Sequence, residues 1–240
     1  MTNEEFYNHF LVIVDKIGTD ALPLLDEEEL SVLANDAQEN LILDKYDSKQ
    51  NKNFEGFEQT EKRSQEIGDI VRYKEINTFT SGFFPNAVYV ELPNTLLSNP
   101  TDFSDVFWFT VYEECETDLK DCDNKNSRVD VLERSHNDWA FIKGDPFNKP
   151  NKERIIRLRS EERKHQLITD GTYNILKYFV GYIRKPIPID LAGIATNQVS
   201  ELSDSFHREL LEKTIYRALK TTDNPRIQTE VETSVANIAK

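Results

Sequence analysis

One stretch limits the possible folds of this chain more than any other. Residues 172–191, TYNILKYFVGYIRKPIPIDL, are rich in β-branched and aromatic side chains and favour a long strand. Apolar side chains fall on both faces in its middle, so the strand has to lie at the centre of a sandwich or beneath helices. Pro186 and Pro188 then end the strand, because proline has no backbone N–H to donate to a neighbouring strand.

Helices are predicted towards both ends of the chain, where apolar residues recur at helical spacing. The predicted helices cover residues 3–18, 27–46, 61–72 and about 203–221. Further strands are predicted at residues 86–93, 105–114, 127–133 and 153–160, and a short helical turn follows Ser135. Helices followed by strands and then a helix indicate an α+β protein rather than an alternating α/β one.

We therefore predict an α+β fold in which helices at both chain ends pack beside an antiparallel β-sheet or sandwich. The expected divisions are an N-terminal helical part (1–72), a β-rich part (73–200), a C-terminal helix packing with the N-terminal helices (201–222) and a tail (223–240). In the tail, Ile227, Val231 and Val235 recur four residues apart. Such a thin apolar stripe predicts docking against another surface.

Composition excludes some classes of function. The chain has 240 residues and a net charge of −14, which argues against a general nucleic-acid binder because such proteins need a basic face. No apolar run approaches the roughly 20 residues that span a bilayer. The first residues carry acids and no basic n-region, so they do not form a signal peptide. We expect a protein made and kept in a cytoplasm, with no membrane partner.

A search for chemistry finds little in the sequence. The glycines are scattered singly, there is no His-Glu-x-x-His motif, and the four histidines lie in four different segments. The acidic stretch 113–126 has side chains that suit calcium but lacks the spacing and the turn glycine of a calcium loop. A metal-dependent hydrolase that uses Asp121 and Asp123 stays an alternative. We predict no catalytic residue, no cofactor and no metal ligand.

The charge of the chain is polarised. Residues 1–50 carry a net charge of −9, and residues 151–190 a net charge of +4. Contacts between an acidic face of one copy and a basic face of the next can close into a ring. The candidate interface residues are Arg154, Arg157, Arg159, Arg184 and Lys185, with Ile227, Val231 and Val235 in the tail.

A basic strand follows a turn bracketed by Pro146 and Pro150, in DPFNKPNKERIIRLRS. Strand alternation predicts that Ile156 and Leu158 enter the core, while Arg157 and Arg159 point outward. The outward arginines would meet carboxylates on a neighbouring subunit or line a channel for DNA.

Several motifs in a fixed order resemble those of a known family, the neck ring or head–tail connector proteins of crAss-like and related podovirus-type phages. They are LLDEEELSVLANDAQENLILDKY (24–46), FEGFEQTEKRSQEIGDIV (54–71), SHNDWAFIKGDPFNKPNKERIIRL (135–158), YFVGYIRKPIPIDL (178–191) and ELSDSFHRELLEKTIYRAL (201–219). Asp145 replaces the usual Asn before Pro146, and Ser203 replaces a common Pro. Both are good turn or cap residues, so the fold should be unaffected.

The resemblance covers nearly the whole chain and implies a structural virion protein without enzymatic activity. It implies a homo-oligomeric ring of twelve copies in the neck or tail region, between the portal protein and other neck or tail ring proteins. DNA would pass through the lumen without sequence-specific binding, and assembly would occur in the bacterial host cytoplasm. The alternative is a monomeric adaptor that binds a host or phage protein.

Overall fold

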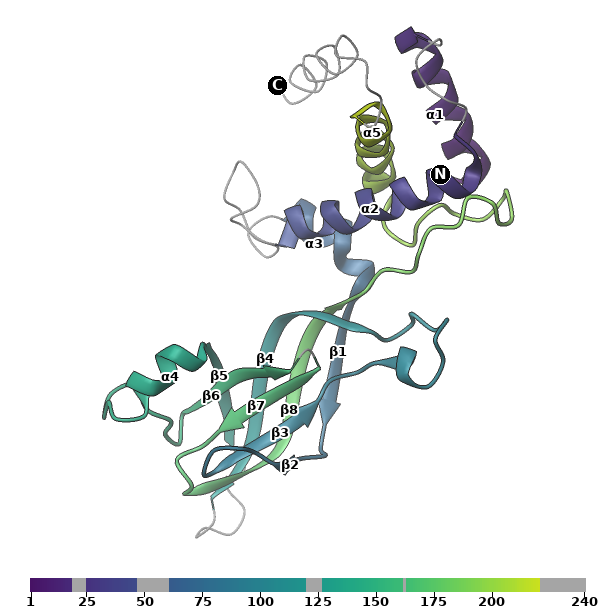
Figure 1. The fold of residues 1–240 in the computed structure, drawn as a ribbon. Helices are drawn as coiled ribbons and strands as arrows, with labels where there is room; N and C mark the ends of the chain where they lie inside the picture. Colours follow the sequence, from purple (N-terminus) through teal and green to yellow (C-terminus); the bar gives the residue numbers. More distant parts are fainter. Residues whose placement is uncertain (19–24, 47–60, 120–126, 162, 221–240) are drawn as a thin grey trace. The chain divides into compact units, whose positions relative to one another are not determined.

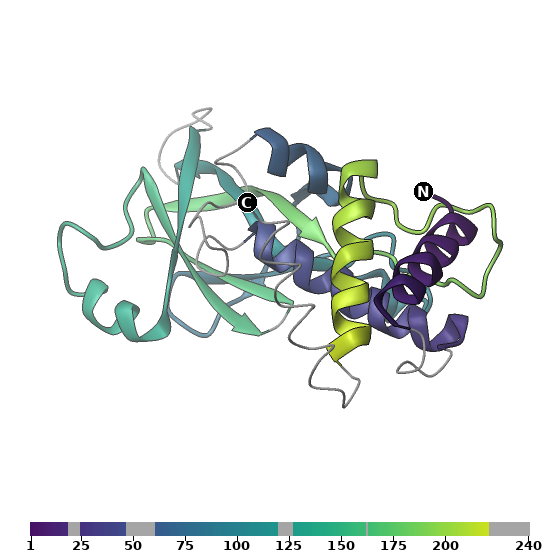
Figure 2. The same ribbon diagram turned by 90° about the horizontal axis from the view of Figure 1, so that it is seen from above.

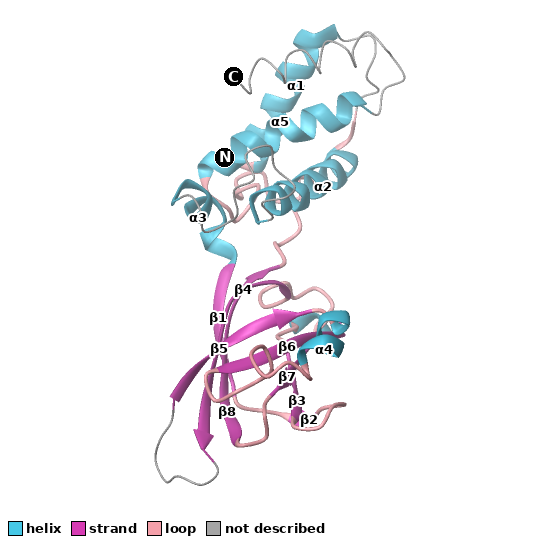
Figure 3. Ribbon diagram, turned by 90° about the vertical axis from the view of Figure 1, so that its left-hand side faces the viewer, coloured by secondary structure: helices cyan, strands magenta, loops and turns pink. Residues whose placement is uncertain are grey.

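The chain forms two compact units. The computed structural model describes residues 1–18, 25–46, 61–119, 127–161 and 163–220. One unit consists of Met1–Ile70 together with Pro186–Lys240, and the other of Val71–Lys185. Helices build the first unit and a large sheet builds the second (Figures 1 and 3). The predicted α+β class is therefore confirmed.

The helical unit is built from segments far apart in the sequence. Its elements are α1 (Asn3–Gly18), α2 (Glu27–Tyr46), α3 (Glu61–Ile67), the 3-10 turn η2 (Gly68–Ile70) and α5 (Asp204–Lys220). α5 crosses α2 (Figure 2). The core of this unit includes Phe6 of α1, Ile42 of α2 and Phe206 of α5, all with no exposed surface. Burial of these apolar faces drives the association of the helices.

The predicted helix over residues 61–72 is wrong at its end. α3 stops at Ile67, η2 follows, and Val71 already begins a strand. Gly68 weakens the helix at that point, because glycine has the greatest backbone freedom to lose. The following residues gain more from pairing with a long neighbouring strand than a helix could offer.

Side chains of α2 bind the proline-containing segment that returns to the helical unit. The Asn35 amide donates to the Ile189 carbonyl at 2.9 Å and accepts from its N–H at 2.7 Å. The Ser31 hydroxyl accepts from the Leu191 N–H at 2.9 Å, and the Gln38 amide accepts from the Ser200 hydroxyl at 2.7 Å. Asn3 of α1 adds donors to the Asp190 and Ile194 carbonyls, so side chains of two helices satisfy backbone groups of a segment that is itself neither strand nor helix.

The other unit is an eight-stranded sheet. Its strands are β1 (Val71–Ile76), β2 (Thr80–Ser81), β3 (Ala87–Glu91), β4 (Phe107–Leu119), β5 (Ser127–Arg134), β6 (Arg154–Glu161), β7 (Lys164–Ile168) and β8 (Tyr173–Arg184). The spatial order is β1-β8-β4-β5-β6-β7-β3-β2. β8 lies between β1 and β4 and ends before Pro186, as its sequence predicts.

The sheet is mixed, whereas the sequence led us to expect an antiparallel one. The described pairs are antiparallel except β5–β6, which is parallel. Parallel neighbours need a crossover connection rather than a hairpin. The chain supplies one here, consisting of α4 (His136–Ile142) and the turn that contains Pro146 and Pro150.

The sheet curls until its two halves face each other. β7 and β8 are four positions apart in strand order. In a flat sheet that separation would be about 19 Å at the usual strand spacing. Instead, Nδ1 of His165 on β7 lies 2.8 Å from the hydroxyl of Tyr178 on β8. The inner face therefore encloses a core between facing strands, and its buried members include Ile76, Val90, Cys115, Val129, Ile155, Leu167, Tyr178, Val180 and Tyr182.

α4 covers one part of the outer face. The Ser135 hydroxyl accepts from the Asp138 N–H at 3.0 Å, and the Asp138 carboxylate accepts from the Ser135 N–H. This capping box confirms the helical turn predicted after Ser135. Trp139 of α4 packs with Phe84 against a small second core formed by Ala87, Ile156, Leu158 and Ile168.

None of the described helices is long and apolar enough to cross a membrane.

The inner core predicts that truncating two leucines of the sheet unit, one buried and one partly exposed, will lower the free energy of unfolding by different amounts. Leu167 on β7 has no exposed surface, whereas Leu176 on β8 is 37% exposed. Leu167→Ala should lower the free energy of unfolding by about 2–5 kcal/mol, the usual cost of such a core truncation. Leu176→Ala serves as the matched control and should cost clearly less. Urea unfolding of both variants measures the difference, and equal costs would contradict the curled core.

Candidate functional site

Arg157 lies inside the curled sheet rather than on its surface. Its side chain is only 3% exposed, so the predicted outward orientation of this arginine is wrong. Both faces of β6 are covered: Ile155 and Arg157 face inward, while Ile156 and Leu158 lie beneath α4. Alternation assigns side chains to the two faces of a strand but does not show which face is exposed to solvent.

Arg157 belongs to a buried polar network. Its Nε donates to the Glu113 carboxylate at 2.8 Å, and one terminal nitrogen lies 2.7 Å from a Glu133 carboxylate oxygen. The other terminal nitrogen lies 3.4 Å from Nε2 of His165. On the far side of the imidazole, Nδ1 lies 2.8 Å from the Tyr178 hydroxyl and 3.3 Å from a Glu113 carboxylate oxygen, and the Tyr178 hydroxyl in turn donates to Glu113. The network therefore closes on itself across β4, β6, β7 and β8.

The partners of His165 fix its tautomer. A guanidinium can only donate, so Nε2 has to accept and the proton sits on Nδ1. Nδ1–H then donates to the Tyr178 hydroxyl, and that hydroxyl donates its own hydrogen bond to the Glu113 carboxylate. A neutral imidazole in this orientation satisfies every contact of the ring. Protonation of Nε2 would place its N–H against the N–H groups of the Arg157 guanidinium, and the hydrogen bond between the two side chains would be lost.

Burial and neighbouring charge shift the pKa values of the network in opposite directions. Desolvation, with the Arg157 charge beside the ring, lowers the pKa of His165 despite the opposing pull of Glu113. Burial alone would raise the pKa of Glu113, but the hydrogen bond from His165 and the charge of Arg157 outweigh it, so this pKa is lowered. Burial and Glu113 raise the pKa of Tyr178. At neutral pH the network consists of one cation, carboxylates, and a neutral histidine and tyrosine.

This network has the chemistry of a structural element. Glu113 and Arg157 neutralise each other, and the side chains of both are less than a tenth exposed. In the part of the chain that the structure describes, no group of three or more His, Cys, Asp or Glu side chains could hold a metal ion. Cys115, on the same inner face, is a buried free thiol whose pKa burial raises well above its ordinary value. A thiol of that kind is a poor nucleophile.

The other predicted interface residues have different environments. Arg184 is 4% exposed, and its guanidinium donates to the Phe103 and Lys185 carbonyls. Lys185 is half-buried and its N–H donates to the Val106 carbonyl at 2.7 Å. Both residues thus contribute to the end of β8. The tail candidates lie outside the described residues; they are Ile227, Val231 and Val235.

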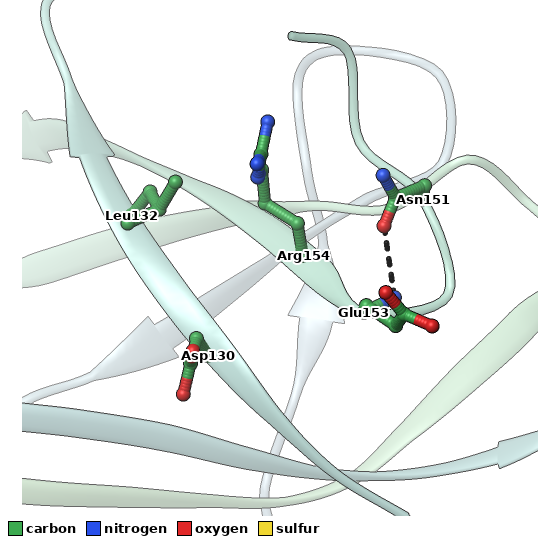
Figure 4. A pocket seen from close by; sticks show the side chains of 5 residues that line it. All are labelled: Asp130, Leu132, Asn151, Glu153 and Arg154. Carbon is green, nitrogen blue, oxygen red and sulfur yellow. Dashed lines mark hydrogen bonds between the residues drawn. The ribbon is translucent and has the colours of Figure 1, made fainter. Parts of the chain in front are cut away.

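Arg154 and Arg159 do reach the surface, on opposite faces of β6: Arg154 is on the outer face with Ile156 and Leu158, and Arg159 is on the same face as Arg157, at the exposed end of the strand. Arg154 is half-exposed and donates to the Phe147 carbonyl at 3.2 Å. It lines a shallow hollow of about 370 Å³ whose other walls are Asp130, Leu132, Asn151 and Glu153 (Figure 4). Arg159 is exposed, and its carbonyl lies 2.9 Å from Nε2 of His136 at the start of α4.

The solvent-facing side chains of residues 134–159 form a distinct surface, which we call the α4 surface. Leaving aside Arg157 and Arg159, which are on the other face of β6, it carries five Lys and Arg against three Asp and Glu. Two large aromatic side chains protrude from it, Phe141 with 81% and Phe147 with 84% of the side chain exposed. A groove of about 800 Å³ runs beside α4, with Phe84, Trp139 and Pro150 among its walls.

Sequence reasoning found the charge of this surface but missed its aromatic residues. A signal was available in SHNDWAFIKG. Two residues along a helix correspond to a rotation of about 200°. If Trp139 faces the sheet, Phe141 has to face away from it, which is what the structure shows.

Comparison with known proteins shows similarity along nearly the whole chain. The family model described as phage tail ring protein 3/4 matches residues 1–227, which include most of both units. The chain is 30% identical over 236 residues to Ring protein 3 of Bacteroides phage crAss001, covering 91% of this chain and 95% of the relative. It is 27% identical over 251 residues to Ring protein 4/5 of the same phage, covering 97% and 98%.

The buried network predicts that two neighbouring arginines differ sharply in their effect on stability. Arg157→Met leaves the Glu113 carboxylate buried without its cation, which should cost about 3–5 kcal/mol of unfolding free energy. The matched control Arg159→Met removes an exposed charge and should change stability by no more than about 0.5 kcal/mol. Urea unfolding monitored by circular dichroism provides both values. Similar costs for the two variants would contradict the inward position of Arg157.

The network also predicts how stability depends on pH. His165 has a lowered pKa in the folded chain, so below its unfolded value of about 6.5 the unfolded chain takes up protons first. The free energy of unfolding should therefore fall as the pH drops from about 7. Glu113, whose folded pKa is also lowered, adds a further loss below its unfolded value of about 4.3.

The histidine contribution can be isolated by substitution. Gln at position 165 keeps a donor and an acceptor but does not titrate, so His165→Gln should flatten part of the decline between pH 7 and 5.5. His207 of the helical unit is also buried, and desolvation lowers its pKa, so it should account for a second part. Stability measured by urea unfolding across this range tests the expectation. An unchanged slope in the His165→Gln variant would refute it.

Proposed function

The chain belongs to the phage tail ring protein 3/4 family, and on that premise we propose that it is a structural virion protein that assembles into a ring in the neck or tail of a crAss-like phage. The family resemblance drawn from the sequence motifs is thereby confirmed. The observation that carries the proposal is the extent of the match, because it covers residues 1–227 rather than one motif. A shared module inside an unrelated protein would match over a shorter range.

The geometry supports a structural role rather than a catalytic one. Three buried groups with shifted pKa values, His165, Tyr178 and Glu113, are engaged with one another in a closed network. The open hollows beside α4 have mixed linings of basic, acidic, amide and aromatic side chains, with His136 in the larger one. Such surfaces suit contacts with other proteins. We propose no cofactor, no metal and no turnover.

In its finer form, the proposal places the ring between the portal protein and the tail, as a head–tail connector of twelve copies. DNA would pass through the lumen during genome ejection without sequence-specific binding. The net charge of −14 supports this, because an acidic chain repels the phosphate backbone and offers it no strong binding site. Assembly would take place in the host cytoplasm before the particle is complete.

The interface candidates are ranked by their environment in the subunit. Arg154 and Arg159 lie at the surface and keep their proposed role in contacts between copies. Arg157 and Arg184 are buried within the sheet unit, so they support its fold rather than an interface. We retain the tail stripe of Ile227, Val231 and Val235 as a contact with an adjacent subunit or the next ring.

Electron microscopy of purified particles tests the proposed function. The expected result is a closed ring on the tail axis, with twelvefold symmetry, into whose density both units of this chain can be traced. Particles produced without the chain should lack the ring and fail to join heads to tails. Particles that contain no density for this chain, or contain it as isolated copies away from the axis, would contradict the proposal.

A further inference from the structure

The outer face of β1, β8 and β4 is not covered by α4. We call it the β4 surface, and its outward side chains are Tyr73, Glu75, Tyr112, Glu114, Glu116, Asp118, Lys177 and Phe179. They include four carboxylates and a single ammonium group. Tyr73 is 75% exposed and Tyr112 is 46% exposed. The surface thus has acidic and aromatic character, whereas the α4 surface is basic and aromatic.

The acidic groups of the β4 surface are held in place by local contacts. Lys177 lies 3.2 Å from Glu75 and 3.8 Å from Glu116. Arg128 of the neighbouring β5 pairs with Glu114 at 2.9 Å. The carboxylates therefore outnumber the cations that they contact, and their positions are defined before any partner arrives. A preorganised charged surface of this kind favours specific docking.

The two surfaces point away from each other. The contact between His165 on β7 and Tyr178 on β8 shows that these strands face each other across the interior. The outer sides of β7 and β8 must therefore face in opposite directions. α4 packs over the outer side of β6 and β7, while the β4 surface is the outer side of β1, β8 and β4. Figure 1 shows α4 and β1 on opposite sides of the sheet unit.

Opposite and complementary surfaces on one subunit are what a head-to-tail contact requires. The α4 surface carries a net charge of +2 and the β4 surface a net charge of −3. Each also presents two exposed aromatic side chains that could be buried together. A heterologous contact of this kind repeats from copy to copy and closes into a ring when the rotation permits. A self-complementary pair would instead stop at a dimer.

We infer that the α4 surface of one copy docks onto the β4 surface of the next copy, with Phe141 and Phe147 as the apolar anchors against Tyr73 and Tyr112. This inference rests on the proposed ring function and names the surfaces that form the ring. Lys143 and Lys149 lie beside the anchors and meet the carboxylates of the neighbour. The contact would bury two phenylalanines that are more than 80% exposed in the single subunit.

Two complementary variants test the contact. Phe141→Asp with Phe147→Asp disables the α4 surface, and Tyr73→Lys with Tyr112→Lys disables the β4 surface. Sedimentation velocity of each variant alone should show self-association weakened by about 30-fold or more, the factor for interface hot spots. An equimolar mixture retains one intact contact per pair, so it should form a complex of twice the 27.9 kDa chain mass and nothing larger.

Matched controls and a second pair of variants keep the test decisive. Leu97→Asp replaces another apolar side chain that is 75% exposed and belongs to neither surface, and this variant should associate like the original chain. If an aromatic variant fails to fold, charge reversal replaces it: Lys143→Glu with Lys149→Glu should abolish association, and Glu75→Lys with Glu116→Lys in the same chain should restore it.

The outcomes separate this inference from the proposed function. A mixture of the aromatic variants that stays monomeric, or either variant alone that still assembles like the original chain, would overturn the contact between these surfaces. If particles that carry Phe141→Asp with Phe147→Asp still contain the ring at normal occupancy, the contact between these surfaces is overturned as well. The proposed ring function would then remain supported. Particles of the original phage without any ring of this chain would overturn the proposed function itself.

Discussion

The buried contact between Arg157 and Glu113 is the interaction on which the sheet unit depends. A guanidinium and a carboxylate inside a protein are stable only when each meets the other and the remaining polar atoms are satisfied. Glu113 is on β4, Arg157 on β6, His165 on β7 and Tyr178 on β8. Their contacts can form only if the sheet curls until β7 faces β8. The polar network thus selects one curvature and one register from those that a purely apolar interior would allow.

The curl has a direct consequence for assembly. A flat sheet would present one outer face in one direction, whereas a curled sheet presents its outer side in opposite directions. The crossover between β5 and β6 places α4 and its lysines on one of these sides and leaves the other open. The two surfaces of a head-to-tail contact therefore follow from the same feature that closes the core. In this account, the fold of a single subunit already contains the polarity that a ring needs.

Much of the secondary structure could be predicted from periodicity and capping. Residues 3–18 and 27–46 coincide with α1 and α2, the predicted 203–221 is close to α5, and the capping box at Ser135 marks α4. β7 was missed because KHQLI is short and follows β6 after a tight turn. The parallel pairing of β5 and β6 has no local signal, since it depends on where a crossover returns the chain.

The candidate site could be predicted only in part, for a physical reason. Local charge is visible in a sequence, so the basic stretch at Arg154 and Arg159 was found. Whether a given arginine is solvated depends on strands far away in the chain, and Arg157 is buried by partners at positions 113 and 133. β6 is covered on both faces and still alternates, because its inward face carries the buried Arg157. The exposed Phe141 and Phe147 were missed because only the charges and the turn of this stretch were considered, and not which side of the short helix each aromatic residue occupies.

Hydroxyl-radical footprinting of the chain, free and within intact particles, tests the account most directly. Phe141 and Phe147 on the α4 surface and Tyr73 and Tyr112 on the β4 surface are exposed in the free chain, as are Leu97 and Ile194 elsewhere. The account predicts that all four aromatic side chains lose reactivity in particles, because each copy uses both surfaces, while Leu97 or Ile194 retains it. Unchanged reactivity at either aromatic pair would contradict the head-to-tail contact.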